Sequence, residues 1–255
     1  MRNVKVVVEF DGTDYFGFQF QPNHPTIQAE IERVLEKILK EKVTVHGSGR
    51  TDAGVHAAGQ VISFRTEGTI PIDRLCVAMN SLLPRDIAAL RASEMDSEFH
   101  ARYSAKSRLY RYDILNADAK SALRGRFCWH VREPLDVDAM REAATPLIGV
   151  HDFTSFACVA KDEGSPIREM MSIDINSLSP AGGEGRGEGG SLVTIDMKAN
   201  AYLRSMVRVI VGTLVEVGLG RRRSSDLRGI LEAKDRGAAG KTAPPQGLCL
   251  VEVGY

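Results

Sequence analysis

The order of strand-like and helix-like segments most constrains the fold of this chain, because the order is repeated. In the first part, a strand-like segment at 4–10 precedes a helix-like segment at about 26–40. A strand-like segment at 61–66, a second helix-like segment after Pro71 and a strand-like segment at 87–90 follow. Apolar side chains recur with period 2 in the strand-like segments and with period 3.6 in the helix-like ones. The pattern predicts a half in which helices cover a sheet.

A similar order starts again near residue 105. It predicts five further strands and three further helices, with the strands at 107–115, 127–131, 168–176, 191–198 and 248–253, and the helices at 136–148, 200–217 and 225–234. We therefore expect two α/β halves, residues 1–104 and 105–255. The segment GGEGRGEGG at 182–190 lies between two predicted strands and is expected to form a flexible hairpin tip.

Charge and hydropathy exclude some classes of protein. Lys and Arg number 33, as do Asp and Glu, so the net charge is zero. This argues against attraction to polyanions over the whole surface, but a basic face can be balanced by acidic residues elsewhere. No apolar run approaches the roughly 20 residues that span a bilayer. The first residues indicate a strand and turn rather than a signal peptide, which predicts a cytoplasmic protein without a membrane partner.

Two patterns that resemble known sites are weak. The four cysteines contain no closely spaced pair of the kind that zinc sites use, so we expect reduced thiols in or near a core: Cys76, Cys128, Cys158 and Cys249. The sequence Gly240-Lys241-Thr242 resembles the end of a phosphate-binding P-loop. A P-loop has a glycine five residues before this position, where the chain has Asp235. A P-loop also follows a strand, whereas Gly240 follows a predicted helix. Nucleotide binding is therefore not expected there.

The stretch GSGRTDAGVHAAGQVISF, residues 47–64, places a carboxylate among glycines just before a strand. Asp52 could cap a turn or pair with Arg50, as many loop aspartates do. Alternatively, the glycines could let the backbone approach a bulky ligand while Asp52 acts on it as a nucleophile or base. His56 could be a base, although a hydrogen-bonded structural histidine is the better interpretation.

Charged and aromatic residues in the second half also allow two interpretations. Arg204 and Arg208 lie one helical turn apart in a segment that is apolar nearly all round, so they need an anionic partner. That partner could be Asp196 or Glu216, or else a site carboxylate or an RNA phosphate. Tyr110 could be a core aromatic residue. It could also belong to an RNA-binding surface, because basic residues surround it: Arg102, Lys106, Arg108 and Arg111.

Four separated motifs, taken together, resemble one family. They are GRTDAGVHAAGQVISF at 49–64, YRY at 110–112, NAYLRSMVRVIVGTLVEVG at 200–218 and TAPPQGLCLVEVGY at 242–255, and FDGTDYFGFQFQP near the N-terminus supports them. In this order, over nearly the whole chain, the motifs resemble the tRNA pseudouridine synthase A family. The segment 182–190 is the clearest departure from it. The resemblance implies an α+β pseudouridine synthase fold, with mostly antiparallel sheets joined around a central catalytic, RNA-binding cleft.

The resemblance also implies an activity and a site. Family members isomerise uridine to pseudouridine at positions 38, 39 and 40 of the tRNA anticodon stem-loop, as homodimers, without metal, redox group or nucleotide cofactor. By resemblance, Asp52 is the nucleophile, and Tyr110 packs against the flipped uracil. Arg208 pairs with Asp52, Arg50 holds the RNA near the extruded base, and Leu248 lines the pocket. The sequence leaves open whether Asp52 attacks ribose C1′ or uracil C6. A non-catalytic RNA-binding module and a P-loop phosphotransferase are the alternatives.

Overall fold

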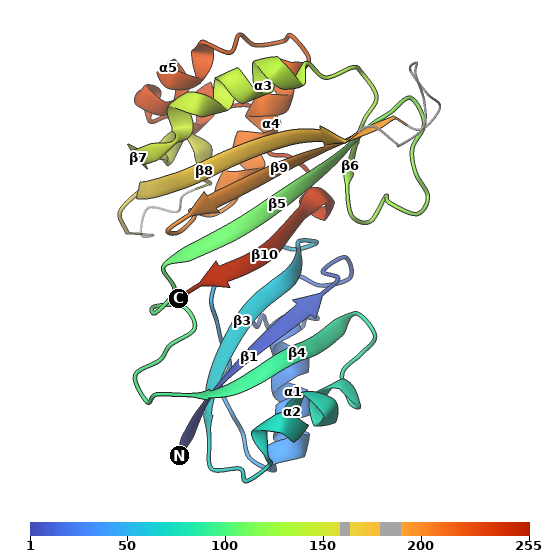
Figure 1. The fold of residues 1–255 in the computed structure, drawn as a ribbon, viewed down its shortest axis with the longest axis vertical. Coiled ribbons are helices and arrows are strands. Elements are labelled where there is room, and N and C mark those ends of the chain that lie inside the picture. The colour runs from blue at the N-terminus through green and yellow to red at the C-terminus, as the bar shows by residue number, and fades with distance from the viewer. Residues whose placement is uncertain (159–163, 179–189) are drawn as a thin grey trace. The chain divides into compact units, whose positions relative to one another are not determined.

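The computed structural model describes residues 1–158, 164–178 and 190–255 (Figure 1). By compactness, these residues form two units, one of Met1–Arg108 with Cys249–Tyr255 and one of Leu109–Leu248. The last seven residues thus group with the first unit. The division into domains 1–104 and 105–255 stays a prediction.

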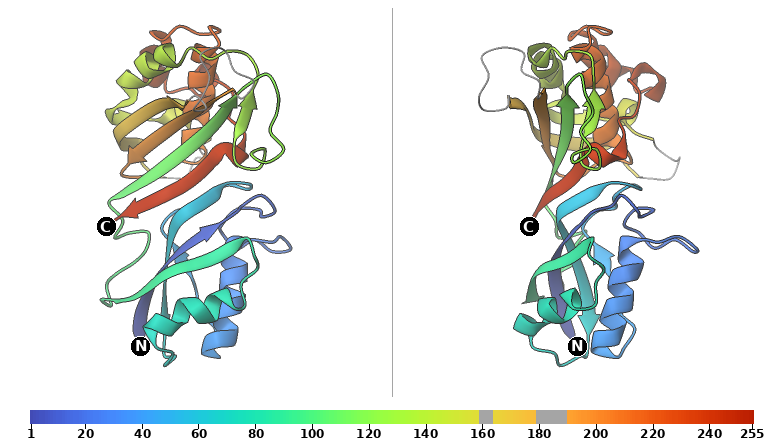
Figure 2. Two further views of the ribbon diagram at one scale, coloured as in Figure 1. Left: turned by 45° about the vertical axis from the view of Figure 1, so that its right-hand side comes forward. Right: turned by 90° about the vertical axis from the view of Figure 1, so that its right-hand side faces the viewer.

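The first unit is a sheet with two helices. Its elements are β1 (Arg2–Phe10), α1 (Ile27–Leu39), β2 (His46–Gly47), β3 (His56–Thr66), α2 (Ile72–Asn80) and β4 (Ile87–Met95). Strand β1 pairs antiparallel with both β3 and β4, and the three run side by side (Figure 1 and Figure 2). The strand β10 (Leu248–Gly254) lies along the other edge of β3 and is parallel to it.

The helices of the first unit begin where the sequence predicts. The side chain of Thr26 accepts a hydrogen bond from Ala29 N–H and caps α1, whose apolar stripe is buried. The left-handed conformation of Lys40 ends α1. Helix α2 follows Pro71, as predicted, and ends at Asn80.

The described residues of the second unit form further strands and three α-helices. Its elements are β5 (Ser107–Asn116, of which the first two residues belong to the first unit), β6 (Trp129–Val131), α3 (Val137–Ala144), β7 (Gly149–Asp152), β8 (Ile167–Leu178), β9 (Ser191–Ala199), α4 (Met206–Gly218) and α5 (Asp226–Ala233). The strand order is β5-β9-β8-β7, and β8 is antiparallel to both β7 and β9. Helix α3 packs against α4, α5 and β8. Most of the pairings in the two units are antiparallel, as expected from the resemblance.

Helix α4 is the core of the second unit. Every residue in it is buried except Arg208 and Glu216, which confirms the prediction of a buried, largely apolar helix. The predicted start at residue 200 is wrong. Ser205 has a left-handed backbone conformation with φ of 59°, and the helix begins only after it. Arg204 therefore lies outside the helix and is exposed.

Other boundaries also differ from the predictions. Helix α3 ends at Ala144, and a 3₁₀ turn at Thr145–Leu147 replaces its predicted last residues. The predicted strand at 127–131 begins at Trp129, because Phe127 closes a turn with Arg124. The short strand β7 was not predicted. Of the glycine-rich segment 182–190, only Gly190 is among the described residues, so its hairpin conformation stays a prediction.

Candidate active site

Asp52 occupies the first position of a tight turn. The N–H of Val55 donates to the carbonyl oxygen of Asp52 at 3.2 Å, and Gly54, the third residue, has a φ of 76°. Such a turn favours glycine at the third position, because other residues are strained there. The turn therefore requires glycine at position 54. The Asp52 side chain, at the start of this turn, is partly exposed.

A neighbouring loop, residues 11–25, braces this turn on both sides of Asp52. Phe18 N–H donates to the Thr51 carbonyl oxygen at 3.1 Å, and Gly54 N–H donates to the Tyr15 carbonyl oxygen at 3.3 Å. The two backbones approach so closely that a Cβ atom at Gly17 would lie 2.6 Å from the Thr51 oxygen. The backbone around Asp52 is thus held in one conformation by the loop 11–25.

Two other glycines of the stretch are explained by packing. A Cβ atom at Gly47 would lie 2.5 Å from the ring of Phe18, and one at Gly59 would lie 2.2 Å from the Val251 carbonyl oxygen. Both contacts are within the first unit. The hypothesis that the glycines admit a ligand is therefore not needed for Gly47 or Gly59.

A buried polar network fixes the start of the same stretch. Ser48 Oγ donates to Gln60 Oε1 at 2.6 Å, and Gln60 Nε2 donates to the Gly49 carbonyl oxygen at 2.9 Å. Arg108 Nη2 donates to the carbonyl oxygens of Ser48 and Arg102, each at 2.8 Å. Arg108 is buried, so the expectation that it belongs to a basic RNA-binding surface is wrong. Its guanidinium instead satisfies backbone carbonyls.

His56 and Arg50, which flank Asp52 in the sequence, differ in environment. His56 is buried, and its Nδ1 accepts a hydrogen bond from Gly12 N–H at 3.1 Å, which supports the structural interpretation. The same Nδ1 lies 3.1 Å from Asp11 Oδ1. A nitrogen that accepts a hydrogen bond from Gly12 N–H carries no proton to donate to Asp11. The role of Nδ1 is therefore to accept the backbone hydrogen bond. Arg50 is exposed, and none of the described residues forms a hydrogen bond or ion pair with its side chain. The interpretation of Asp52 as the structural partner of Arg50 is therefore wrong.

In the second unit, Arg208 is hydrogen-bonded to the segment that follows α5. Its Nε donates to the Ala243 carbonyl oxygen at 2.8 Å, and Ala243 N–H donates back to the Arg208 carbonyl oxygen at 2.9 Å. The two acids considered as its partners have other contacts. Asp196 accepts two hydrogen bonds from Arg111, each at 2.8 Å, and Glu216 pairs with Arg222 at 3.2 Å.

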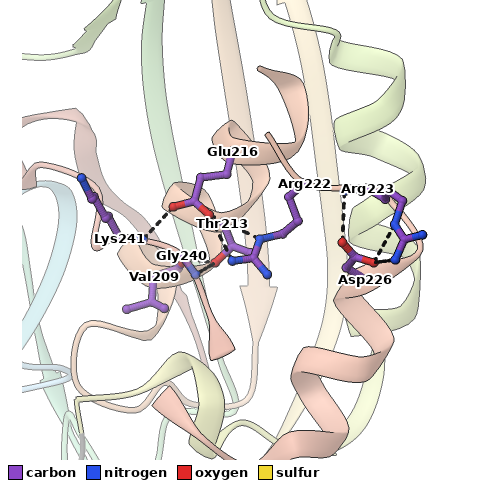
Figure 3. A network of polar contacts seen from close by, with 8 residues as sticks. All are labelled: Val209, Thr213, Glu216, Arg222, Arg223, Asp226, Gly240 and Lys241. Atoms are coloured by element: carbon purple, nitrogen blue, oxygen red, sulfur yellow. Dashed lines mark hydrogen bonds and ion pairs between the residues drawn. The ribbon is translucent and has the colours of Figure 1, made fainter. Parts of the chain in front are cut away.

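The segment around Ala243 is held by a polar network on α4 (Figure 3). Gly240 N–H donates to Thr213 Oγ1 at 2.9 Å, and Lys241 N–H donates to Glu216 Oε1 at 3.1 Å. A Cβ atom at Gly240 would lie 2.8 Å from the Glu216 carboxylate. Phosphate binding by a P-loop requires free backbone N–H groups and no adjacent carboxylate. The Gly240-Lys241-Thr242 pattern is therefore not a P-loop here.

Strand β5 presents two buried tyrosines. Tyr110 is 7% exposed, and its ring lies perpendicular to that of Tyr202 at a centroid distance of 5.1 Å. Tyr112 is fully buried and donates from its hydroxyl to the Pro244 carbonyl oxygen at 2.7 Å. Burial raises the pKa of Tyr112. Leu248, the first residue of β10, is also buried.

The remaining candidate ligands are dispersed. Among residues 1–158, 164–178 and 190–255, no three His, Cys, Asp or Glu side chains are grouped as a metal site would need. All four cysteines are free thiols. Cys158 is exposed, so the expectation that it lies in or near a core is wrong. Each helix among the described residues is too short or too polar to cross a membrane.

Comparison with known proteins decides the family. A family model described as tRNA pseudouridine synthase matches residues 6–104 and 143–255. The chain belongs to the tRNA pseudouridine synthase family. Curated relatives named tRNA pseudouridine synthase A share 42% identity in Thermoanaerobacter sp. (strain X514) and 44% in Brevibacillus brevis, each over 100% of both chains. The relative from Moorella thermoacetica is 45% identical over the same share. The resemblance seen in the motifs is thereby confirmed.

Similarity to solved structures is weak. The chain matches one described as "Crystal structure of the archaeal box H/ACA sRNP Nop10-Cbf5 complex" with a TM-score of 0.33 and 12% identity. The match covers 83% of this chain and 44% of that one. Family membership therefore depends on the sequence relatives.

Proposed function

We propose that this chain isomerises uridine to pseudouridine in the anticodon stem-loop of tRNA, at positions 38, 39 and 40. The reaction breaks the bond between ribose C1′ and uracil N1, turns the uracil and forms a bond between C1′ and C5. The observation that carries the proposal is Asp52, a partly exposed carboxylate on a turn braced on both sides, in a chain of the pseudouridine synthase family.

Asp52 is the proposed nucleophile. A carboxylate can attack an electron-poor carbon and leave again, as in retaining glycosidases. Attack at ribose C1′ and attack at uracil C6 both fit this role. The braced turn supports it, because a nucleophile held in one position loses little conformational freedom on the way to the transition state.

The other proposed site residues divide between binding and orientation. Arg50, exposed and without a partner among the described residues, would contact the RNA backbone beside the extruded base. Tyr110 would pack against the flipped uracil, and Leu248 would line the pocket. Arg208 would pair with Asp52 and keep it ionised. Its Nε bond to Ala243 supports this role, because that bond limits the directions in which the guanidinium can point.

The assembly and setting are also proposals. The partner is tRNA, bound by a homodimer in the cytoplasm. No metal or nucleotide cofactor takes part. Since the chain has no net charge, binding would depend on a basic face of the dimer that is compensated by acidic residues elsewhere.

The test is conversion of tRNA by the purified protein. A tRNA transcript incubated without ATP or metal should gain a base that reacts with carbodiimide and retains the adduct in alkali. Asp52→Asn should abolish this product and leave tRNA affinity within about threefold, because an amide is a poor nucleophile of similar size. Asp73→Asn, a change at an exposed aspartate on α2, is the matched control.

The alternatives give different results. A non-catalytic RNA-binding module would bind the transcript and leave every uridine unchanged. Near-normal turnover by Asp52→Asn would remove Asp52 from the catalytic role while leaving the activity itself in place.

A further inference from the structure

Two aromatic rings project outward from the loop that braces Asp52. Phe16 is 48% exposed and Phe20 is 53% exposed, whereas Tyr15 and Phe18 in the same loop are buried. Exposed rings close together in sequence are a common mark of an interaction surface. The two buried rings anchor this loop to its unit, so the other two are not needed for that purpose.

The outward position of these rings is built into the loop. Phe16 N–H donates to the Pro25 carbonyl oxygen at 2.9 Å, and the Phe16 carbonyl oxygen accepts from Gln21 Nε2 at 2.8 Å. Phe20 N–H donates to Gln28 Oε1 at 2.9 Å. Both backbone groups of Phe16 are thus occupied, so the backbone that carries its exposed ring is held in one conformation.

The ring of Phe16 is backed by a second exposed ring. Its ring stacks on the imidazole of His24, with the centroids 4.2 Å apart and the planes 28° from parallel. His24 is itself exposed. Two stacked, exposed rings offer a flat surface of the kind that nucleobases stack on.

This surface is coupled to the Asp52 turn. Tyr15 and Phe18, on either side of Phe16, make the two backbone hydrogen bonds to Gly54 and Thr51 that bracket Asp52. The backbone of Phe16 therefore belongs to the segment that positions the proposed nucleophile. A group stacked on Phe16 would therefore be held by the same segment that braces the Asp52 turn.

We propose that Phe16, with His24 behind it, and Phe20 stack an unpaired nucleotide of the substrate RNA next to the uridine that is isomerised. The proposal rests on the proposed function. When a base is extruded from a helix or loop, its neighbours lose a stacking partner, at a cost of a few kcal/mol. Aromatic side chains replace that partner and accept any base, because every base has a π face. Phosphate contacts alone would need cations rather than these rings.

The test separates stacking from general apolar contact. Phe16→Leu keeps an apolar side chain without a π face, and Phe16→Trp keeps the π face. We expect Phe16→Leu to weaken tRNA binding about 5- to 150-fold, the range for the loss of one base–aromatic stack, and Phe16→Trp to bind within about threefold of wild type. Phe20→Leu should act in the same direction. Val77→Ala, at a side chain 66% exposed on α2, is the matched control and should change nothing.

A second arm identifies the RNA group. Transcripts with a single abasic nucleotide on the 5′ or the 3′ side of the target uridine should show one position at which wild-type affinity falls. At that position, Phe16→Leu should cost nothing further, because the stack is already gone. Unchanged affinity of Phe16→Leu for intact tRNA overturns the proposal, and so does full additivity at both abasic positions.

The remaining outcomes are also informative. If Phe16→Leu changes the mass of the particle in solution and leaves RNA affinity unchanged, the rings contact a second copy of the chain and the proposal is wrong. If wild type binds tRNA but forms no pseudouridine, the proposed function fails, while the affinity measurements still decide the role of Phe16.

Discussion

Replacement of Thr213 by valine tests how the segment that holds Arg208 is itself fixed. Thr213 is fully buried in α4, and its hydroxyl donates to the Val209 carbonyl oxygen at 2.8 Å while accepting from Gly240 N–H at 2.9 Å. Valine has nearly the same shape, so Thr213→Val removes these two hydrogen bonds without leaving a cavity. Figure 3 shows that the Gly240 N–H points to the Thr213 side chain.

The expected loss of stability follows from the group that is left unpaired. The Val209 carbonyl already belongs to the helix, so losing the hydroxyl costs little there. Gly240 N–H is buried and would have no acceptor, which costs about 1–3 kcal/mol. For a chain of this length, each kcal/mol lowers the melting temperature by about 2–4 °C.

The measurement compares urea midpoints of wild type, Thr213→Val and Thr213→Ser. Serine keeps the hydroxyl and loses one methyl group. The loss of this buried methyl group lowers the free energy of unfolding by about 1 kcal/mol. We expect Thr213→Val to be less stable than wild type and its single-turnover rate on tRNA to fall, because the segment at 240–243 also positions Arg208. Wild-type stability of Thr213→Val would refute the reasoning, because the Gly240 bond would then contribute nothing.

Three further predictions concern charge. Burial raises the pKa of Asp113 from its ordinary value of 3.8 to about 6, and its Oδ1 has no hydrogen-bond partner among the described residues. A carboxyl group with a raised pKa destabilises the fold fully above pH 6, and it has no effect below the pKa of the unfolded chain. Asp113→Asn should therefore stabilise the protein by about 1–2 kcal/mol at pH 7.5, a value discounted for the partial exposure of Asp113. Near pH 4 the same substitution should change the stability by almost nothing. Urea unfolding of both proteins at the two pH values measures this, and an equal difference at both would contradict it. Arg208→Lys keeps the charge but lacks the Nε–H that bonds to Ala243, so its single-turnover rate on tRNA should lie between those of wild type and Arg208→Met. The logarithm of tRNA affinity should fall linearly with the logarithm of salt concentration, with a slope of about 0.9 for each duplex phosphate contacted, and a flat plot would mean that no basic face binds the RNA.

The sequence predicted those parts of the fold that depend on local patterns. The apolar alternation of β1 and the start of α1 near residue 26 depend on consecutive residues, so the sequence predicts both. Helix α4 was recognised as buried from its composition. Its start was misplaced because the left-handed conformation of Ser205 has no clear signature in residue type.

The part of the site that the sequence did not reveal depends on distant contacts. The basic residues around Arg108 allow a surface interpretation, but its acceptor, the Ser48 carbonyl oxygen, lies 60 positions earlier in the chain. The reason for Gly59 is the backbone of Val251, which no local pattern indicates. Asp52 was singled out by its glycine-rich surroundings and by the family motif, whereas its brace by the loop 11–25 is visible only in three dimensions.

The place of the last strand has a consequence for how the protein is made. Next to His56 and Ala57, the edge of β3 opposite β1 is completed by β10, whose residues after Leu248 are translated after the whole second unit. On the ribosome, the N-terminal unit therefore emerges early but cannot close its sheet until Cys249–Tyr255 has left the exit tunnel. During that interval the part of the β3 edge next to His56 and Ala57 is available for pairing with another chain. The unit that carries the proposed nucleophile is thus begun first and completed last.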